Sequence, residues 1–180
     1  SIRRQRQMCI RDSSGAATVS LTSFEHYQLE RAKTWEHIAL VSGRHVSGDS
    51  ETGKAVDQVR RNILSRKRDL HQFSMDAIKM LERIREQRIS EVSDVQINTK
   101  LRPGGLMETE YLIACLSIKL APQHPDILDL AYPDMVVRIA ELSGMDNLAE
   151  NLQFWRVLQI WERLLGLEPV SYTHLTLPTN

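Results

Sequence analysis

Two carboxylates, three and five residues after a pair of glycines, are the residues of this sequence best placed to do chemistry. The segment reads Leu101-Arg102-Pro103-Gly104-Gly105-Leu106-Met107-Glu108-Thr109-Glu110-Tyr111. The glycines lack Cβ, so the backbone there can turn sharply or approach a ligand or another chain closely. Glu108 and Glu110 fall near the start of an apolar helical pattern, where the helix dipole stabilises negative charge. A carboxylate in this place can hold a metal-bound water, a basic partner or the helix start.

The spacing of the two glutamates limits what they can do together. Residues two apart on an α-helix point about 200° apart, so Glu108 and Glu110 cannot both face one partner. We expect one of them inside the protein or in a cleft and the other on the solvent side. A plainer interpretation is a loop followed by an acidic first helical turn. Lys100 and Arg102 could offer positive charge to a phosphate, or could be solvated charges at a strand edge.

Trp35 and Glu36 form a second candidate pair, on a long helix that we expect from Thr22 or Ser23 to about Val46. Thr22 or Ser23 is the expected N-cap, Thr22 could form a capping box with Glu25, and Gly48 is expected to close the helix. Trp35 lies on the apolar stripe of this helix and is predicted to be in the core. Glu36 would then point to one side of the core, towards whatever packs over the helix.

Composition and motifs exclude several classes of function. Lys+Arg and Asp+Glu number 23 each, so the protein has no net positive charge that would attract nucleic acid or an anionic membrane. No apolar run approaches the roughly 20 residues of a membrane span. His26 and His37, eleven apart on the expected helix, share a face but are too distant to chelate one metal. Cys9 and Cys115 have no partner at metal spacing, and a reduced cytoplasmic setting is the simplest inference.

A basic cluster follows the second helical pattern, with Arg60, Arg61, Arg66, Lys67 and Arg68. A nucleotide- or nucleic-acid-binding patch is conceivable there. No aromatic residue interleaves with these charges, so bases would have no stacking platform. We therefore interpret the cluster as a solvated helix end and loop.

Hydrophobic periodicity predicts an all-α fold, a helical bundle or array in which strands are at most a minor element. Leu70, Phe73, Ala77, Leu81 and Ile84 mark the clearest helix, which ends near Arg88. Further helices are expected around 55–63, over 106–120, as a short turn or helix around 127–130, from Pro133 to Gly144, and from a cap at Asp146 to Gly166. Alternation over 95–101 predicts a short strand.

The two ends are expected to be non-native tails, residues 1–13 and 170–180. A DNA word that encodes Met8–Asp12 has a reverse complement that encodes Val170–His174. One short DNA word on opposite strands at opposite ends is typical of read-through into a sequencing adapter. We therefore exclude both ends from the fold prediction and expect the remainder to be an internal fragment of a longer protein.

Two ordered blocks of the sequence resemble a known family. Gly104–Leu112, GGLMETEYL, is similar to the Gly-Gly-Leu-x-Asp-Ile-Glu-Phe motif in the helical part of bifunctional glutamine synthetase adenylyltransferase/adenylyl-removing enzymes. The upstream block is similar to the family's stretch around Trp-Glu-His, Ala-Leu and Gly-Asp, and comprises Ser23–Gln28, Thr34–His37, Ala39-Leu40 and Val46–Asp49. The order and separation of the blocks also fit, and the resemblance covers roughly residues 15–167.

The resemblance implies a helical domain, residues 23–169, that follows a nucleotidyltransferase domain of which residues 14–22 are the edge. The chain looks closer to the C-terminal, adenylylating half. That half transfers AMP from ATP to a tyrosine of glutamine synthetase with Mg²⁺ held by carboxylates, and the other half removes AMP by phosphorolysis. Those carboxylates are expected upstream, so the isolated chain should be inactive. The implied partners are glutamine synthetase and a PII-type regulatory protein. The alternative is a non-catalytic helical interaction or regulatory module.

The resemblance also ranks the candidate residues. Glu110 aligns with the second carboxylate of the family motif and is the better candidate for a cleft, whereas Glu108 is one methylene longer than the family's Asp. Where the family has Arg-Ala-Arg, this chain has Ser42-Gly43-Arg44 and keeps one arginine. The cleft or motif residues predicted from sequence are Trp35, Glu36, Lys100, Arg102, Gly104, Gly105, Glu108 and Glu110.

Overall fold

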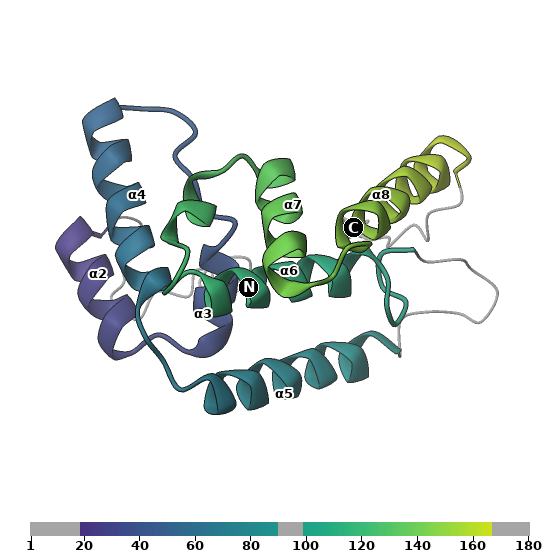
Figure 1. Cartoon of the computed structure of the whole chain (residues 1–180), viewed down its shortest axis with the longest axis horizontal. Coiled ribbons are helices and arrows are strands. Elements are labelled where there is room, and N and C mark those ends of the chain that lie inside the picture. The colour runs from purple at the N-terminus through teal and green to yellow at the C-terminus, as the bar shows by residue number, and fades with distance from the viewer. Residues whose placement is uncertain (1–18, 90–98, 167–180) are drawn as a thin grey trace, which may run out of the picture.

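The computed structural model describes residues 19–89 and 99–166. Within these ranges the chain consists of helices and loops, with no strand, so the predicted all-α fold is confirmed (Figure 1). The elements in chain order are α2 (Leu21–Glu30), α3 (Thr34–Leu40), α4 (Ser50–Ser65), α5 (Leu70–Ile89), α6 (Leu106–Leu120), the 3₁₀ helix η1 (Pro125–Asp129), α7 (Tyr132–Ser143) and α8 (Leu148–Leu164). No helix in the described ranges is both long and apolar enough to cross a membrane.

Helix α6 is the centre of the array, and it begins immediately after the Gly-Gly pair. It contacts α3, α4, α5, η1, α7 and α8, and Figure 1 shows α5 along one side of it and α7 and α8 along the other. A helix enclosed in this way must be apolar on most of its circumference. Accordingly, Ile113 and Ile118 are fully buried, together with Ile63, Leu64, Ile127, Val136 and Ile139 from the surrounding elements.

The spacing of apolar residues and the positions of proline and glycine predict several of these helices correctly. α5, α6, η1 and α7 all form where the apolar spacing places them. Pro133 lies in the first turn of α7, where its missing N–H costs nothing. Gly144 ends α7 in a left-handed conformation with φ +68°, which glycine adopts without a Cβ penalty.

The single helix predicted from Thr22 or Ser23 to Val46 is wrong, because the chain breaks between α2 and α3. Ser20, rather than Thr22 or Ser23, caps α2 by accepting the Ser23 N–H at 3.2 Å. The break is held by Glu36, whose carboxylate accepts the Lys33 N–H at 3.1 Å and the Tyr27 hydroxyl at 2.9 Å. Glu36 therefore joins the two helices.

The histidines and the tryptophan of this region also lie differently from prediction. His26 and His37 are on separate helices, so they do not share a face. His37 is buried, its Nε2 lies 2.9 Å from the Gln28 carbonyl oxygen, and burial lowers the pKa of the imidazole. Trp35 is 36% exposed rather than in the core, because α3 buries the neighbouring His37 and Ile38 instead.

Three further boundary predictions need correction. Gly48, with φ +105°, does not close a helix but precedes Asp49, whose carboxylate caps α4 by accepting the Thr52 N–H at 2.8 Å. Asn147, not Asp146, precedes α8, without a side-chain cap. Of the strand predicted over 95–101, residues 95–98 lie outside the described residues and the remainder, Thr99–Leu101, forms a turn.

Candidate functional site

The turn that contains the two glycines is closed by backbone hydrogen bonds. Gly105 donates to the Arg102 carbonyl at 2.8 Å and Leu106 donates to the Thr99 carbonyl at 3.1 Å. Gly104 has φ +75°, a left-handed conformation that favours glycine. At Gly105 the backbone is extended with φ −75°, so sterics rather than φ require glycine. A Cβ there would lie 2.5 Å from the Thr99 carbonyl oxygen and 2.8 Å from that of Arg102.

Glu108 is buried and fastens this turn to α5. Its two oxygens accept from Arg85 Nε and Nη2, both at 2.6 Å, and one also accepts the Gly104 N–H at 2.8 Å. Bidentate arginine–carboxylate pairs are geometrically specific. The hydrogen bond from Arg85 holds the pKa of Glu108 below its usual range. The geometry gives this carboxylate a structural role, because its oxygens are already occupied.

A second buried carboxylate fastens the same turn to α8. Glu162 accepts the Thr99 N–H at 2.9 Å and also accepts the Thr99 hydroxyl. Both residues are buried. The Gly-Gly turn is therefore fixed by helices from both sides, by Arg85 on α5 and by Glu162 on α8.

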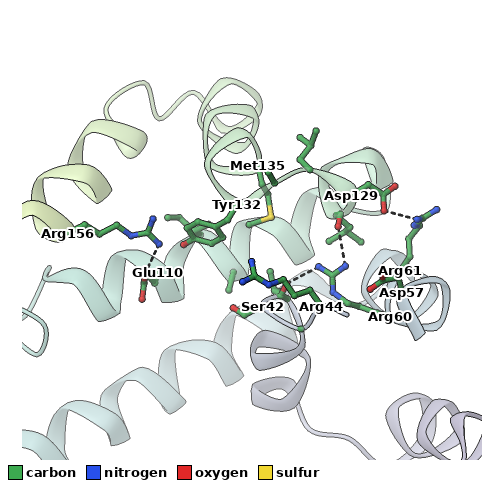
Figure 2. A pocket seen from close by; sticks show the side chains of 17 residues that line it. Ser42, Arg44, Asp57, Arg60, Arg61, Glu110, Asp129, Tyr132, Met135 and Arg156 are labelled. Carbon is green, nitrogen blue, oxygen red and sulfur yellow. Dashed lines mark hydrogen bonds and ion pairs between the residues drawn. The ribbon is translucent and has the colours of Figure 1, made fainter. Parts of the chain in front are cut away.

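Glu110 points away from this turn and lines a cavity of about 770 Å³ on the other side of α6. The cavity lies between the α3–α4 connection, α4, α6, the η1–α7 segment and α8. Its floor is apolar and includes Ile113, Ala114, Leu128 and Met135. Figure 2 shows Glu110, Arg156 and Tyr132 at one end, the Arg60–Arg61–Asp129 group at the other, and Arg44 and Met135 between them.

At one end of the cavity, a guanidinium group lies between a carboxylate and an aromatic ring. Arg156 Nη2 is 3.1 Å from Glu110 Oε1, and its guanidinium carbon is 4.8 Å from the centroid of the Tyr132 ring. A cation over an aromatic face is attracted by the ring quadrupole. Burial, with a smaller contribution from Glu110, raises the pKa of Tyr132. These contacts position Arg156 with a single ion-pair contact, so its remaining N–H groups can donate to another partner.

At the other end of the cavity, Arg60 holds two walls together. It donates to three carbonyl oxygens, those of Leu40 at 3.2 Å, Val41 at 2.9 Å and Leu128 at 3.1 Å. The first two end α3 and the third belongs to η1. Arg60 is only 9% exposed, and burial lowers its pKa. The interpretation of the basic cluster as a solvated helix end is therefore wrong for Arg60.

Arg68, from the same cluster, is also half-buried and donates to the Ile63 and Leu64 carbonyls at 3.0 and 3.2 Å. Burial lowers its pKa to about 10. The reason for both departures from prediction is the same: arginine satisfies several carbonyls that the ends of helices leave without intrahelical partners.

The charges around the cavity leave an excess of one positive charge. Four arginines line it, Arg44, Arg60, Arg61 and Arg156, against three carboxylates, Asp57, Glu110 and Asp129. Arg61 pairs with Asp129 at 2.7 Å. Within the described ranges, Arg44 makes no hydrogen bond or ion pair, and it is exposed. The cavity combines an apolar floor with a rim that favours an anion.

The structure does not bring the eight residues singled out from sequence into one site. Of these eight residues, only Glu110 lines the cavity that contains the four arginines, which we call the arginine-rich cavity. Lys100 and Arg102 are exposed on the Gly-Gly turn, beside Gly104, Gly105 and Glu108. Trp35 and Glu36 lie on α3, where Trp35 lines a separate depression with Lys33, Asp76 and Arg83. The two glutamates do diverge, Glu108 towards Arg85 and Glu110 into the cavity, while a cleft or catalytic role for either stays a prediction.

Sequence reasoning missed Arg156 and Tyr132 and misjudged Arg60. One signal could have identified Arg60, because it stands four residues after Val56 and three before Ile63, on the apolar stripe of α4. Arg156 lies beside the apolar stripe of α8, next to Trp155, but nothing local shows that it faces Glu110. That contact joins residues 46 apart in sequence.

Comparison with known proteins gives one consistent result. A family model described as glutamate-ammonia ligase adenylyltransferase matches residues 11–59. The bifunctional glutamine synthetase adenylyltransferase/adenylyl-removing enzyme of Xanthomonas axonopodis pv. citri (strain 306) is 40% identical over 115 residues, which are 64% of this chain and 12% of that protein.

Two further relatives carry the same name. The enzyme of Thioalkalivibrio sulfidiphilus (strain HL-EbGR7) is 35% identical over 129 residues, 72% of this chain and 13% of that protein. The enzyme of Aromatoleum aromaticum (strain DSM 19018 / LMG 30748 / EbN1) is 29% identical over 160 residues, 86% of this chain and 17% of that protein. The chain thus spans a small part, 12 to 17%, of the length of these relatives.

Proposed function

This chain matches a fragment of the bifunctional glutamine synthetase adenylyltransferase/adenylyl-removing enzymes, and on that premise we propose that it is a helical part of such an enzyme. In the whole enzyme it would pack beside a nucleotidyltransferase domain and form one wall of the cleft in which AMP passes from ATP to a tyrosine of glutamine synthetase. The observation that carries the proposal is the match itself, which covers 64 to 86% of the chain.

The described residues do not fit a magnesium site of their own. In ranges 19–89 and 99–166, no three or more His, Cys, Asp or Glu side chains are grouped so that they could hold a metal ion. We therefore propose that ATP and Mg²⁺ are bound mainly by another part of the enzyme, where Mg²⁺ would polarise the phosphate. The helices described here would pack against the nucleotidyltransferase domain and would form a charged wall of the cleft.

The partners of this segment are part of the same proposal. The relatives are named for acting on glutamine synthetase, and we propose glutamine synthetase as the protein substrate here, with a PII-type protein as a regulator and a cytoplasmic location. We assign the segment to the C-terminal, adenylylating half. The second candidate, a non-catalytic helical interaction module, is favoured by the large exposed apolar side chains on α8 and at its C-cap, namely Phe154, Val157, Ile160, Trp161, Leu164 and Leu165.

The chain alone is expected to transfer no AMP, because the carboxylates that hold the metal would be elsewhere. The measurement incubates it with magnesium, labelled ATP and glutamine synthetase, and follows label on the synthetase. A complete adenylyltransferase from a relative is the positive control. Label that depends on the chain and exceeds background would overturn the assignment of the chemistry to another part of the enzyme.

A further inference from the structure

The cavity lined by Glu110 has the size and lining of a site for a small organic ligand. Its volume of about 770 Å³ falls within the roughly 300–1,000 Å³ of typical ligand sites. Ile113, Ala114 and Met135 offer an apolar floor on which a flat ring system could lie. None of these three residues belongs to the Gly-Gly turn, which Arg85 and Glu162 hold through Glu108 and Thr99.

The rim selects an anion of low charge. Arg44 has no partner among the described residues, and Arg61 and Arg156 are each held by one ion-pair contact. Ion pairs this exposed contribute little to stability, so a phosphate can compete with them. Asp57, Glu110 and Asp129 also line the cavity and would repel a ligand with many negative charges.

The walls of this site are held in place before any ligand arrives. Arg60 joins the end of α3 to η1 through three carbonyls, and the Tyr132 ring supports the Arg156 guanidinium. A site whose groups are fixed in advance loses less entropy on binding. Arginine suits this role because its planar group binds phosphate oxygens in a bidentate manner.

We propose that the cavity between the α3–α4 connection, α6, α7 and α8 binds a nucleoside monophosphate, with its phosphate at Arg44 and Arg156 and its base on the floor formed by Ile113, Ala114 and Met135. The choice of adenine rests on the proposed function, in which the adenylyl group of ATP is transferred, and the choice of a monophosphate rests on the three lining carboxylates, which would oppose the extra charge of ATP.

The test titrates the 180-residue chain with AMP, ATP, adenosine and inorganic phosphate, followed by calorimetry and by NMR. AMP should bind saturably and more tightly than the other three. Adenosine lacks the phosphate, inorganic phosphate lacks the base, and ATP adds charge that the three carboxylates oppose. Absence of saturable AMP binding up to about 10 mM, which corresponds to roughly −3 kcal/mol, would overturn the proposal, as would equal binding of adenosine.

Three variants locate the binding. Arg44→Gln should weaken AMP binding about tenfold, the amount expected for a lost charged hydrogen bond. Glu110→Gln should strengthen it by about 2- to 5-fold, because a competing carboxylate is removed. Arg138→Gln is the matched control, since Arg138 pairs with Glu141 on the surface of α7 and does not line the cavity. Unchanged affinity in Arg44→Gln would contradict the site. Transfer to glutamine synthetase is not measured, so failure here leaves the proposed function intact.

Discussion

Replacing Gly105 by alanine is expected to lower the free energy of unfolding by about 3–5 kcal/mol, because overpacking against backbone and loss of buried hydrogen bonds act together. The new Cβ would lie 2.5 and 2.8 Å from the carbonyl oxygens of Thr99 and Arg102. Both atoms are backbone and neither can move without breaking the hydrogen bonds that close the turn. Urea denaturation of the two proteins, followed by circular dichroism, measures the difference.

Gly104 provides the matched control for Gly105. A Cβ at Gly104 would meet nothing within 4 Å, so Gly104→Ala should cost only the strain of a left-handed φ, about 1–2 kcal/mol. Comparing the two variants therefore separates the effect of a Cβ collision, at Gly105, from the effect of backbone strain, at Gly104. Equal stability of the two variants would mean that the turn relaxes around a Cβ and that close approach to Thr99 is not the reason for glycine.

Replacing Arg60 by methionine is expected to lower the free energy of unfolding by about 3–5 kcal/mol, since each buried carbonyl left without a donor costs about 1–3 kcal/mol and water reaches part of the site. The three carbonyls concerned belong to Leu40, Val41 and Leu128. Methionine keeps most of the apolar contact and removes only the donors and the charge. The same urea titration, with thermal unfolding as a second measurement, detects the loss.

Arg61→Met is the control, because Arg61 is the next residue on α4. Its side chain is 36% exposed and makes one ion pair, with Asp129. Such a pair is worth roughly 0–1 kcal/mol, so this variant should differ little from the parent. If Arg60→Met were as stable as Arg61→Met, water would be satisfying the three carbonyls, and Arg60 would not be what joins α3 to η1.

Much of the fold follows from sequence, because burial acts on periodic patterns that are local. α5 shows this for Leu70, Phe73 and Ala77, where spacing of three and four marks one face. α6 adds the Gly-Gly pair before it and Pro122 after it, so both ends are marked. Helix boundaries that no glycine or proline marks were harder to predict. The break between α2 and α3 contains no proline or glycine and depends on contacts made by Glu36.

The candidate site was less predictable, because its contacts join distant parts of the chain. The two glutamates illustrate this. Glu108 is occupied by Arg85 from 23 residues earlier, and Glu110 by Arg156 from 46 residues later. Spacing on α6 requires the carboxylates to diverge but does not identify which one meets which arginine. Only tertiary packing makes Glu108 structural and places Glu110 in the arginine-rich cavity.

The most direct test of the central claim is transfer by a hybrid enzyme. In the relative from Xanthomonas axonopodis pv. citri, the 115 residues that match this chain are replaced by the corresponding residues of this chain. A second hybrid carries an unrelated helical segment of equal length. Both are assayed for labelled AMP on the tyrosine of glutamine synthetase. We predict clear transfer by the first hybrid and none by the second. A first hybrid that folds with the circular dichroism of the parent enzyme, yet transfers no more AMP than the second, would contradict the claim that this chain is a working part of an adenylyltransferase.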